Sequence, residues 1–118
     1  MHTCVNHHDD DLDETEVLVF GSACSLTHCQ GFNAASAARY IKLYDAASTG
    51  DVTPGTTLPK FVLGISATGD NAPPFQPPAP IAFSNGIVAI GATAAADTGA
   101  QGSPGANEII ADIGFVPA

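Results

Sequence analysis

The chain has 118 residues, a formal net charge of −9, a 45% share of hydrophobic residues and no Trp. A domain of this length buries roughly two-thirds of the surface that its unfolded chain exposes, so the chain has room for one well-packed domain. Three basic residues stand against twelve acidic ones, and so few cations cannot neutralise a run of phosphates. Composition therefore excludes binding to nucleic acid or to an anionic membrane as a primary function.

The first sixteen residues differ in character from the rest of the chain. They carry six of the twelve acidic residues, all between positions 9 and 16, and three of the four histidines. Beyond Val5 and Leu12 they show no apolar residue at the spacing of a helix or a strand. We therefore predict a mobile, acidic, His-containing N-terminal arm over residues 1–16 and a folded domain over residues 17–118.

Targeting signals and cysteines bear on the compartment. No apolar run approaches the roughly 20 residues that a transmembrane helix needs, and the first four residues lack the basic and hydrophobic regions of a signal peptide. The cysteines number three, and an odd count does not indicate a disulfide scaffold. We expect a chain that is made and kept in a cytosol.

Short apolar runs separated by turn-forming residues predict strands. The clearest run places Tyr40, Lys42 and Tyr44 on one face and Ile41 and Leu43 on the other, under a period of two. The aliphatic face is expected to point inward. In chain order, the predicted strands span residues 17–20, 23–32, 37–44, 61–65, 81–90 and 109–115.

The segments between these runs have loop chemistry. Residues 45–59 are rich in Gly, Thr, Ser and Pro, and residues 72–80 contain five prolines, which predicts an extended surface connector. Asn85-Gly86 indicates a tight turn or a kink within the run 81–90. Residues 91–107 are small and flexible. At least six short strands without a helical period predict an all-β fold, an antiparallel, jelly-roll-like β-sandwich.

Two segments carry a resemblance to a known group. Residues 37–45 read Ala-Ala-Arg-Tyr-Ile-Lys-Leu-Tyr-Asp, and residues 81–87 read Ile-Ala-Phe-Ser-Asn-Gly-Ile, with a loop rich in Thr, Pro and Gly after the first. Over about residues 31–116 the chain resembles small virion structural proteins of tailed bacteriophages. The resemblance implies a β-sandwich virion component, such as a head-decoration, cement or fibre-associated protein, commonly a homotrimer, and it implies no catalytic residue.

Cysteine and histidine form two clusters that have the chemistry of zinc ligands. The spacing lacks a Cys-x-x-Cys pair, and in a regular strand Cys24 and Cys29 would point to opposite faces. Buried cysteines beside a solvated histidine-rich arm are the simpler interpretation, and a Cys24–Cys29 disulfide would need a turn between the two. We therefore predict no cofactor and keep zinc as an open alternative. The candidate ligands are Cys4, His7, His8, Cys24, His28 and Cys29.

Enzymatic chemistry has little support in the sequence. His28 is the only histidine after residue 16, and neither a Gly-x-Ser-x-Gly motif nor a phosphate-binding loop occurs. We predict that the chain is not an enzyme. The strip formed by Tyr40, Lys42 and Tyr44 is a candidate interface, because tyrosine is enriched at interfaces, and packing against a neighbouring sheet or loop is an equal alternative.

The main functional hypothesis is a capsid decoration or cement subunit that stabilises the phage head by protein–protein contacts. Its expected partners are the major capsid protein or other virion proteins and further copies of itself. Its expected location is the capsid surface, after assembly in the bacterial host cytoplasm. The alternatives are a carbohydrate- or receptor-binding module of a tail or fibre, and a metal-stabilised structural domain.

Overall fold

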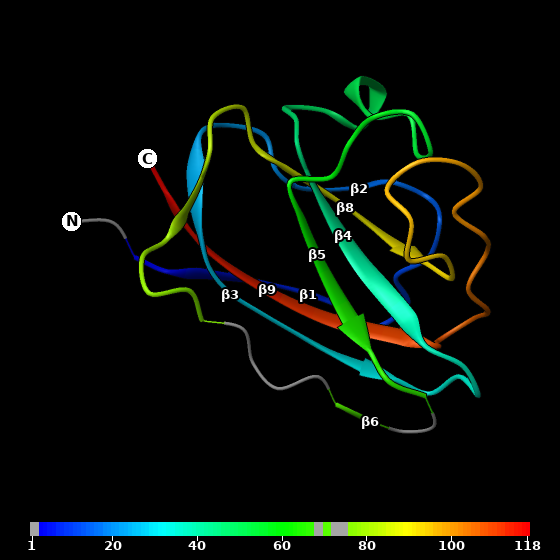
Figure 1. Ribbon diagram of the computed structural model, residues 1–118. Coiled ribbons are helices and arrows are strands. Elements are labelled where there is room, and N and C mark those ends of the chain that lie inside the picture. Colours follow the sequence, from blue (N-terminus) through cyan, green and yellow to red (C-terminus); the bar gives the residue numbers. More distant parts are fainter. Residues whose placement is uncertain (1–2, 68–69, 72–75) are drawn as a thin grey trace.

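The computed structural model describes residues 3–67, 70–71 and 76–118 of the chain. Within these residues nine strands form two antiparallel sheets that pack face to face, with one short 3-10 helix, η1 (Thr49–Asp51) (Figure 1). The predicted all-β antiparallel sandwich is confirmed. In the part of the chain that the structure describes, no helix has the length and apolarity to cross a membrane.

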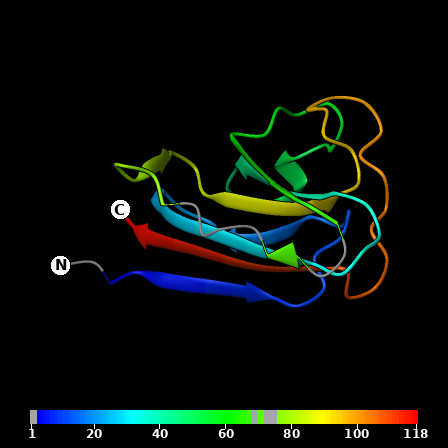
Figure 2. The same ribbon diagram turned by 60° about the horizontal axis from the view of Figure 1, so that its bottom comes forward.

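Strands that follow one another in the chain mostly belong to different sheets. The first sheet has the order β1-β9-β3-β6, with β7 also paired to β3, and the second has the order β2-β8-β4-β5. Figure 2 separates the two layers, with β1 and β9 in one and β8 in the other. The strands are β1 (Val5–Asp9), β2 (Val17–Phe20), β3 (Cys24–Asn33), β4 (Arg39–Asp45), β5 (Phe61–Ile65), β6 (Asp70–Asn71), β7 (Ile81–Phe83), β8 (Ile87–Ala92) and β9 (Ile109–Pro117).

The chain crosses from one sheet to the other at almost every connection. β6 and β7 pair with opposite ends of β3, so they share one position at the edge of the first sheet. Counting them as one position reduces the nine strands to eight, four in each sheet, and only β4 and β5 follow each other within a sheet. This is the strand arrangement of a jelly roll, which confirms the jelly-roll-like fold predicted from the sequence.

The space between the sheets is filled by one apolar cluster. Ile41 and Leu43 of β4 point into it, as the period of two predicted, and both side chains are fully buried. Ile113 and Phe115 of β9 enter it from the other sheet, and the ring of Phe20 lies 5.0 Å from that of Phe115. Burying each such side chain contributes about 1.5–3 kcal/mol, so this cluster is the main source of stability.

The outward face of the second sheet carries a smaller apolar cluster. Tyr44 of β4 and Val88 and Ile90 of β8 belong to it and are fully buried. Ala46 and Val52, from the long connection between β4 and β5, pack against them. The loop after β4 covers part of this face, and the loop after β8 covers Lys42 beside it. β4 and β8 are antiparallel, so the two loops leave the second sheet at opposite ends and meet where Gly55 pairs with Thr98 (Figure 1).

A β-bulge in β3 changes the direction of its cysteines. The register of β3 against β9 shifts between Leu26 and His28, which makes Thr27 an extra residue. As a result Cys24 and Cys29, five positions apart, both point into the core, with 3% and 0% of their surface exposed. The prediction of opposite faces is wrong because it assumed a regular strand. Both cysteines are free thiols.

Residues 3–16 are part of the sandwich and do not form a mobile arm. β1 pairs with β9 along its whole length. Leu12 is 1% exposed and belongs to the central cluster, and its N–H group donates a 3.0 Å hydrogen bond to the carbonyl oxygen of Ile109. The predicted domain boundary at residue 16 is therefore wrong. Backbone pairing of β1 with β9 and the burial of Leu12 are enough to hold this polar segment in the fold.

The predicted strand 81–90 is divided between the sheets. β7 lies in the first sheet and β8 in the second, so Asn85 and Gly86 mark a crossing between layers. Gly86 has a φ of +146°, and a Cβ there would lie 2.3 Å from the carbonyl oxygen of Phe20, so only glycine fits. The predicted proline-rich connector lies partly outside the described residues, and residues 76–80 form no strand.

Candidate functional site

Tyr40, Lys42 and Tyr44 lie on the outward face of β4, as predicted, but they do not form an exposed strip. Lys42 and Tyr44 are fully buried and Tyr40 is half-buried. The Nζ atom of Lys42 donates a 2.5 Å hydrogen bond to the carbonyl oxygen of Ala96 and a second one to Oε1 of Gln101. Of the two alternatives for this strip, packing against a neighbouring loop describes Lys42 and Tyr44, and an open interface at these two residues is wrong, because the chain's own loops cover them.

Burial shifts the pKa values of Lys42 and Tyr44. It lowers the pKa of Lys42, although the charge of Asp97 acts in the opposite direction. It also raises the pKa of Tyr44, whose hydroxyl has no hydrogen-bond partner among the described residues. This outward face of β4 is therefore an internal polar site beneath a loop.

Three of the six candidate zinc ligands lie on the outward face of the first sheet. Cys4 is exposed, with its Sγ atom 3.3 Å from Oγ1 of Thr27. The ring of His28 lies over Gly114, where a Cβ would come within 2.0 Å of it. The third ligand, His8, pairs with a carboxylate instead of a thiol, as described below.

The other three candidates lie elsewhere. His7 pairs with Ile113 and lies on the opposite face of β1 from His8. Cys24 and Cys29 lie in the core, and burial raises the pKa of Cys29 to about 12, which disfavours the thiolate that a metal binds. Among the described residues no group of three or more His, Cys, Asp or Glu side chains is placed to hold a metal ion.

Asp112 organises a polar cluster on the first sheet. Its Oδ1 atom accepts hydrogen bonds from Nδ2 of Asn6 at 3.1 Å and from Nδ1 of His8 at 2.8 Å. Burial raises the pKa of Asp112, but these hydrogen bonds and the charges of His8 and His28 outweigh it, so the pKa is lowered. The hydrogen bond to Asp112, with its charge, raises the pKa of His8. The cluster joins β1 to β9.

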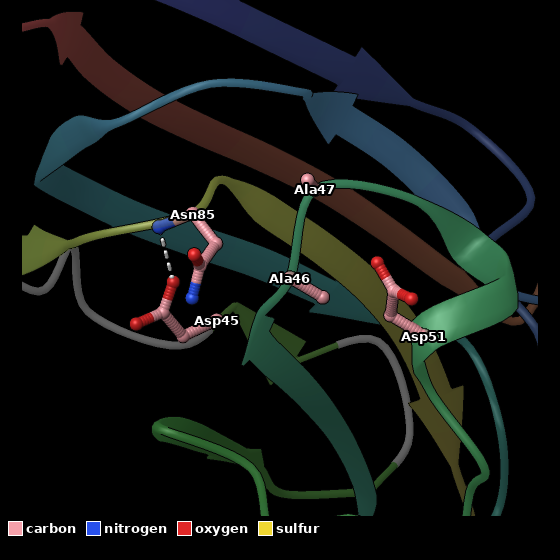
Figure 3. A pocket seen from close by; sticks show the side chains of 5 residues that line it. All are labelled: Asp45, Ala46, Ala47, Asp51 and Asn85. Atoms are coloured by element: carbon pink, nitrogen blue, oxygen red, sulfur yellow. Dashed lines mark hydrogen bonds between the residues drawn. The ribbon is translucent and has the colours of Figure 1, made fainter.

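A pocket of about 270 Å³ opens at the end of the sandwich where β4 leaves the second sheet. Figure 3 shows Asp45 and Asn85 on one side of it and Asp51 on the other, with Ala46 and Ala47 between them. The carboxylate of Asp45 accepts hydrogen bonds from the backbone N–H groups of Ser84, at 3.2 Å, and of Asn85, at 2.8 Å. The polar lining of this pocket suits a ligand with hydroxyl groups.

The exposed apolar side chains of the strands lie on two edge strands. Among the described residues β1 pairs only with β9, and β2 pairs only with β8. Val5 of β1 is 41% exposed and Leu18 of β2 is 44% exposed. Phe20 of β2 contacts Phe115 of β9, and β9 is the neighbour of β1 in the first sheet. The edge strands β1 and β2 therefore lie on the same side of the sandwich. We call this region, with the connecting residues 10–16, the β1/β2 edge.

The acidic segment of the β1/β2 edge is ordered by its own carboxylates. Asp9 accepts a 2.9 Å hydrogen bond from the N–H group of Asp11, and Asp13 accepts one of 2.9 Å from that of Thr15. Asp11 in turn accepts a 2.7 Å hydrogen bond from the N–H group of Asn107. The bonds at Asp9 and Asp13 are local and each holds a turn, and the bond at Asp11 ties the segment to Asn107, so these three carboxylates occupy fixed positions between the two strands.

Comparisons with known proteins give no relative. No protein-family model matches the chain, and neither a curated protein nor a solved structure matches it.

Three polar residues that organise the structure were not predicted as functional from the sequence. Asp112 lies in the predicted closing strand, where its alternation with Ala111 and Ile113 indicated only an outward face. Asn33, the last residue of β3, is fully buried, and Gln101 is 6% exposed within a segment interpreted as a flexible loop. A polar residue at a strand position that faces the core indicates a structural role, and this could have identified Asn33. Nothing near Gln101 in the sequence indicates that its side chain has a buried partner.

Proposed function

We propose that this chain is a non-enzymatic structural subunit of a bacteriophage particle, a decoration or cement protein on the capsid surface. In this proposal it self-associates as a homotrimer and bridges neighbouring capsid proteins. The observation that carries the proposal is the β1/β2 edge, where exposed apolar side chains, open strand edges and fixed negative charge lie together. The resemblance of residues 31–116 to phage virion proteins gives the class of assembly.

Open strand edges favour assembly through backbone pairing. An edge strand presents a row of unpaired N–H and C=O groups, which a strand of another chain can bind. Proteins that stay monomeric usually protect such edges with charge, proline or a covering loop. The four residues of β2 include neither a charge nor a proline, and Leu18 is 44% exposed and offers apolar surface beside the open edge. This combination suits an edge that another copy covers.

Charge indicates the chemistry of the second partner. Six of the twelve acidic residues lie between positions 9 and 16, and this stretch contains no basic residue. Because hydrogen bonds hold Asp9, Asp11 and Asp13 in place, a partner gains the attraction of these three charges without the entropic cost of ordering a free arm. We therefore expect the capsid surface that binds residues 9–16 to be basic, whereas the open edge of β2 faces another copy.

The jelly roll supports the proposal by analogy. The fold is common in viral capsid and lectin domains, but it does not determine function. The functional argument therefore rests on the surface of this chain, and the fold contributes a stable scaffold with two buried clusters.

The test uses the phage that encodes the chain. Purified wild-type particles are expected to contain the protein in a fixed ratio to the capsid protein, by quantitative mass spectrometry. Particles assembled without it are expected to rebind the purified protein and to gain resistance to heat. Absence of the protein from purified particles would contradict the proposal.

Matched variants locate the contact on the subunit. Leu18→Lys places a charge in the β1/β2 edge and is expected to reduce rebinding at least tenfold. Leu58→Lys makes the same change at the most exposed leucine, 65% exposed and in a loop, and is expected to rebind normally. Equal rebinding by both variants would argue against this edge as the contact.

A second candidate function is carbohydrate binding, and the pocket between Asp45, Asp51 and Asn85 favours it. Carboxylate and amide groups hydrogen-bond well to sugar hydroxyls, and lectins are frequent among jelly rolls. A glycan array is the direct measurement. A signal that disappears in Asp51→Ala would favour this candidate, and no signal on the array would remove it.

A further inference from the structure

Lys42 occupies an unusual place for a lysine. Its whole surface is buried on the outward face of β4, beneath the loop that follows β8. Neither of the two ion pairs that the described residues form includes it. Its Nζ atom contacts two uncharged oxygens, the carbonyl of Ala96 and Oε1 of Gln101. A buried ammonium without a paired carboxylate is costly, so burial shifts the equilibrium toward the neutral amine, although the charge of Asp97 opposes this shift.

Gln101 is held in one orientation against this amine. Its Nε2 atom donates hydrogen bonds to the carbonyl oxygens of Ala96, at 3.1 Å, and of Gly99, at 3.0 Å. A flipped carboxamide would place its oxygen against these two acceptors and its NH₂ group against the amine. The partners therefore fix Oε1, and with it the carbonyl carbon Cδ, beside Nζ of Lys42.

The backbone of Gln101 is fixed as well. Its carbonyl oxygen accepts hydrogen bonds from the N–H groups of Thr93, at 2.9 Å, and of Ala94, at 3.2 Å. The side chain of Gln101 is therefore anchored at both ends, which is the positioning that makes a reaction between neighbouring groups effectively unimolecular.

The surroundings exclude water and favour an uncharged nucleophile. Tyr44, two residues after Lys42 on the same face, is fully buried, and its hydroxyl has no partner among the described residues. Burial lowers the pKa of Lys42. A neutral amine in contact with a fixed carboxamide has the composition that an aminolysis reaction requires.

We propose that Lys42 and Gln101 join in an intramolecular isopeptide bond between Nζ and Cδ. The lone pair of Nζ attacks Cδ, the π electrons of the carbonyl move to Oε1, and their return breaks the bond from Cδ to Nε2. One proton passes from Nζ to Nε2, which leaves as ammonia. The products are a secondary amide and one ammonia, so the step needs no oxidant, reductant or further reactant.

This bond gives a loop without regular structure a covalent attachment. The loop after β8 contacts Lys42 on the outward face of the second sheet, beside the apolar cluster there, and the bond ties this loop to the middle of β4. A cross-link between positions 42 and 101 constrains the unfolded chain as a disulfide would. Its loss is expected to lower the Tm by on the order of 10 °C. The inference holds for the chain itself, whatever particle it binds.

The intact mass of the purified, denatured wild-type chain tests the proposal. The expected mass is lower than that of the sequence by one ammonia. Trypsin gives a second readout, because the chain has only three cleavage sites, Arg39, Lys42 and Lys60. With the bond, Lys42 is not cleaved and residues 40–60 remain attached to residues 61–118. An unchanged mass together with a free peptide 43–60 would overturn the proposal.

Variants identify the two participants. Lys42→Met and Gln101→Met are each expected to restore the full sequence mass and to release separate tryptic peptides. Lys60→Met and Gln30→Met change an exposed lysine and an exposed glutamine, and both are expected to keep the loss of ammonia. Loss of ammonia that persists in Gln101→Met would refute the assignment, and because mass is read on denatured chains, this holds even for a variant that folds poorly.

Discussion

Nδ1 of His8 lies 2.8 Å from Oδ1 of Asp112, and this contact joins the first strand of the chain to the last. Sequence reasoning assigned His8 to a mobile arm, but the contact places it on the outer face of a sheet. The pair links a residue whose pKa is raised to one whose pKa is lowered, so it makes stability depend on pH.

The sign of this dependence follows from the two shifts. His8 has a raised pKa, so its contribution is complete below its ordinary value of 6.5 and is lost as pH rises through the folded-state value. Asp112 has a lowered pKa, so its contribution is complete above its ordinary value of 3.8 and is lost as pH falls. We predict that His8→Gln lowers the Tm most near about pH 5 and least above about pH 8.

His7→Gln is the control for this measurement, because His7 lies on the opposite face of β1. Thermal unfolding of both variants and the wild type between about pH 4 and 9 supplies the comparison. A His8→Gln effect that does not change with pH would show that the ion pair contributes nothing to stability.

Leu12 tests whether residues 3–16 belong to the fold. It is 1% exposed in the central cluster, so Leu12→Ala is expected to cost about 2–5 kcal/mol of unfolding free energy in urea. Leu58→Ala removes the same atoms from a 65% exposed position and is expected to change stability by less than about 0.5 kcal/mol. Similar values for the two variants would restore the mobile-arm interpretation.

Asn33 is a buried junction between three segments. Its Nδ2 atom donates to the carbonyl oxygens of Ala37, Ile65 and Ser66, at 2.9, 3.2 and 3.1 Å, and its Oδ1 atom accepts from the N–H group of Ala35 at 2.8 Å. Asn33→Leu keeps the branched outline of the side chain but leaves these backbone groups unpaired.

We predict that Asn33→Leu lowers the free energy of unfolding by at least about 2 kcal/mol. Gln30→Leu, at an exposed position of the same strand, is the matched change and is expected to be nearly neutral. Equal stability of the two variants in chemical denaturation would mean that water satisfies the four groups around Asn33.

The three thiols should differ sharply in reactivity. Cys4 is exposed, whereas Cys24 and Cys29 are buried, and burial raises the pKa of both of these thiols. We predict that a thiol reagent modifies one cysteine quickly in the native protein and all three after unfolding. Fast native labelling at Cys24 or Cys29, located by peptide mass spectrometry, would contradict the buried positions.

The fold was predictable where the pattern of apolar residues was local and regular. Ile41 and Leu43 alternate with polar neighbours, and this alternation gave the inward face of β4 correctly. The N-terminal segment defeated the same reasoning, because β1 is an edge strand whose polar side chains face solvent. Its attachment depends on backbone pairing with β9 and on Leu12, and neither produces a periodic signal.

The candidate sites were harder to predict because they depend on distant contacts. The outward direction of Lys42 was correct, but its burial depends on Gln101, which is 59 positions away. The direction of Cys29 depends on one extra residue at Thr27, and composition does not reveal such a bulge. The β1/β2 edge is formed by two edge strands, so predicting it requires the order of the strands in each sheet. The pattern of residues within a single strand does not contain this order.

The solution mass of the purified protein, measured by light scattering, tests self-association through the β1/β2 edge most directly. The account predicts a mass three times the 11.9 kDa of one chain, unchanged by a chelator, and a single-chain mass for Leu18→Lys. A wild-type protein that keeps the mass of one chain at the highest concentration measured, with Leu18→Lys identical to it, would contradict the account.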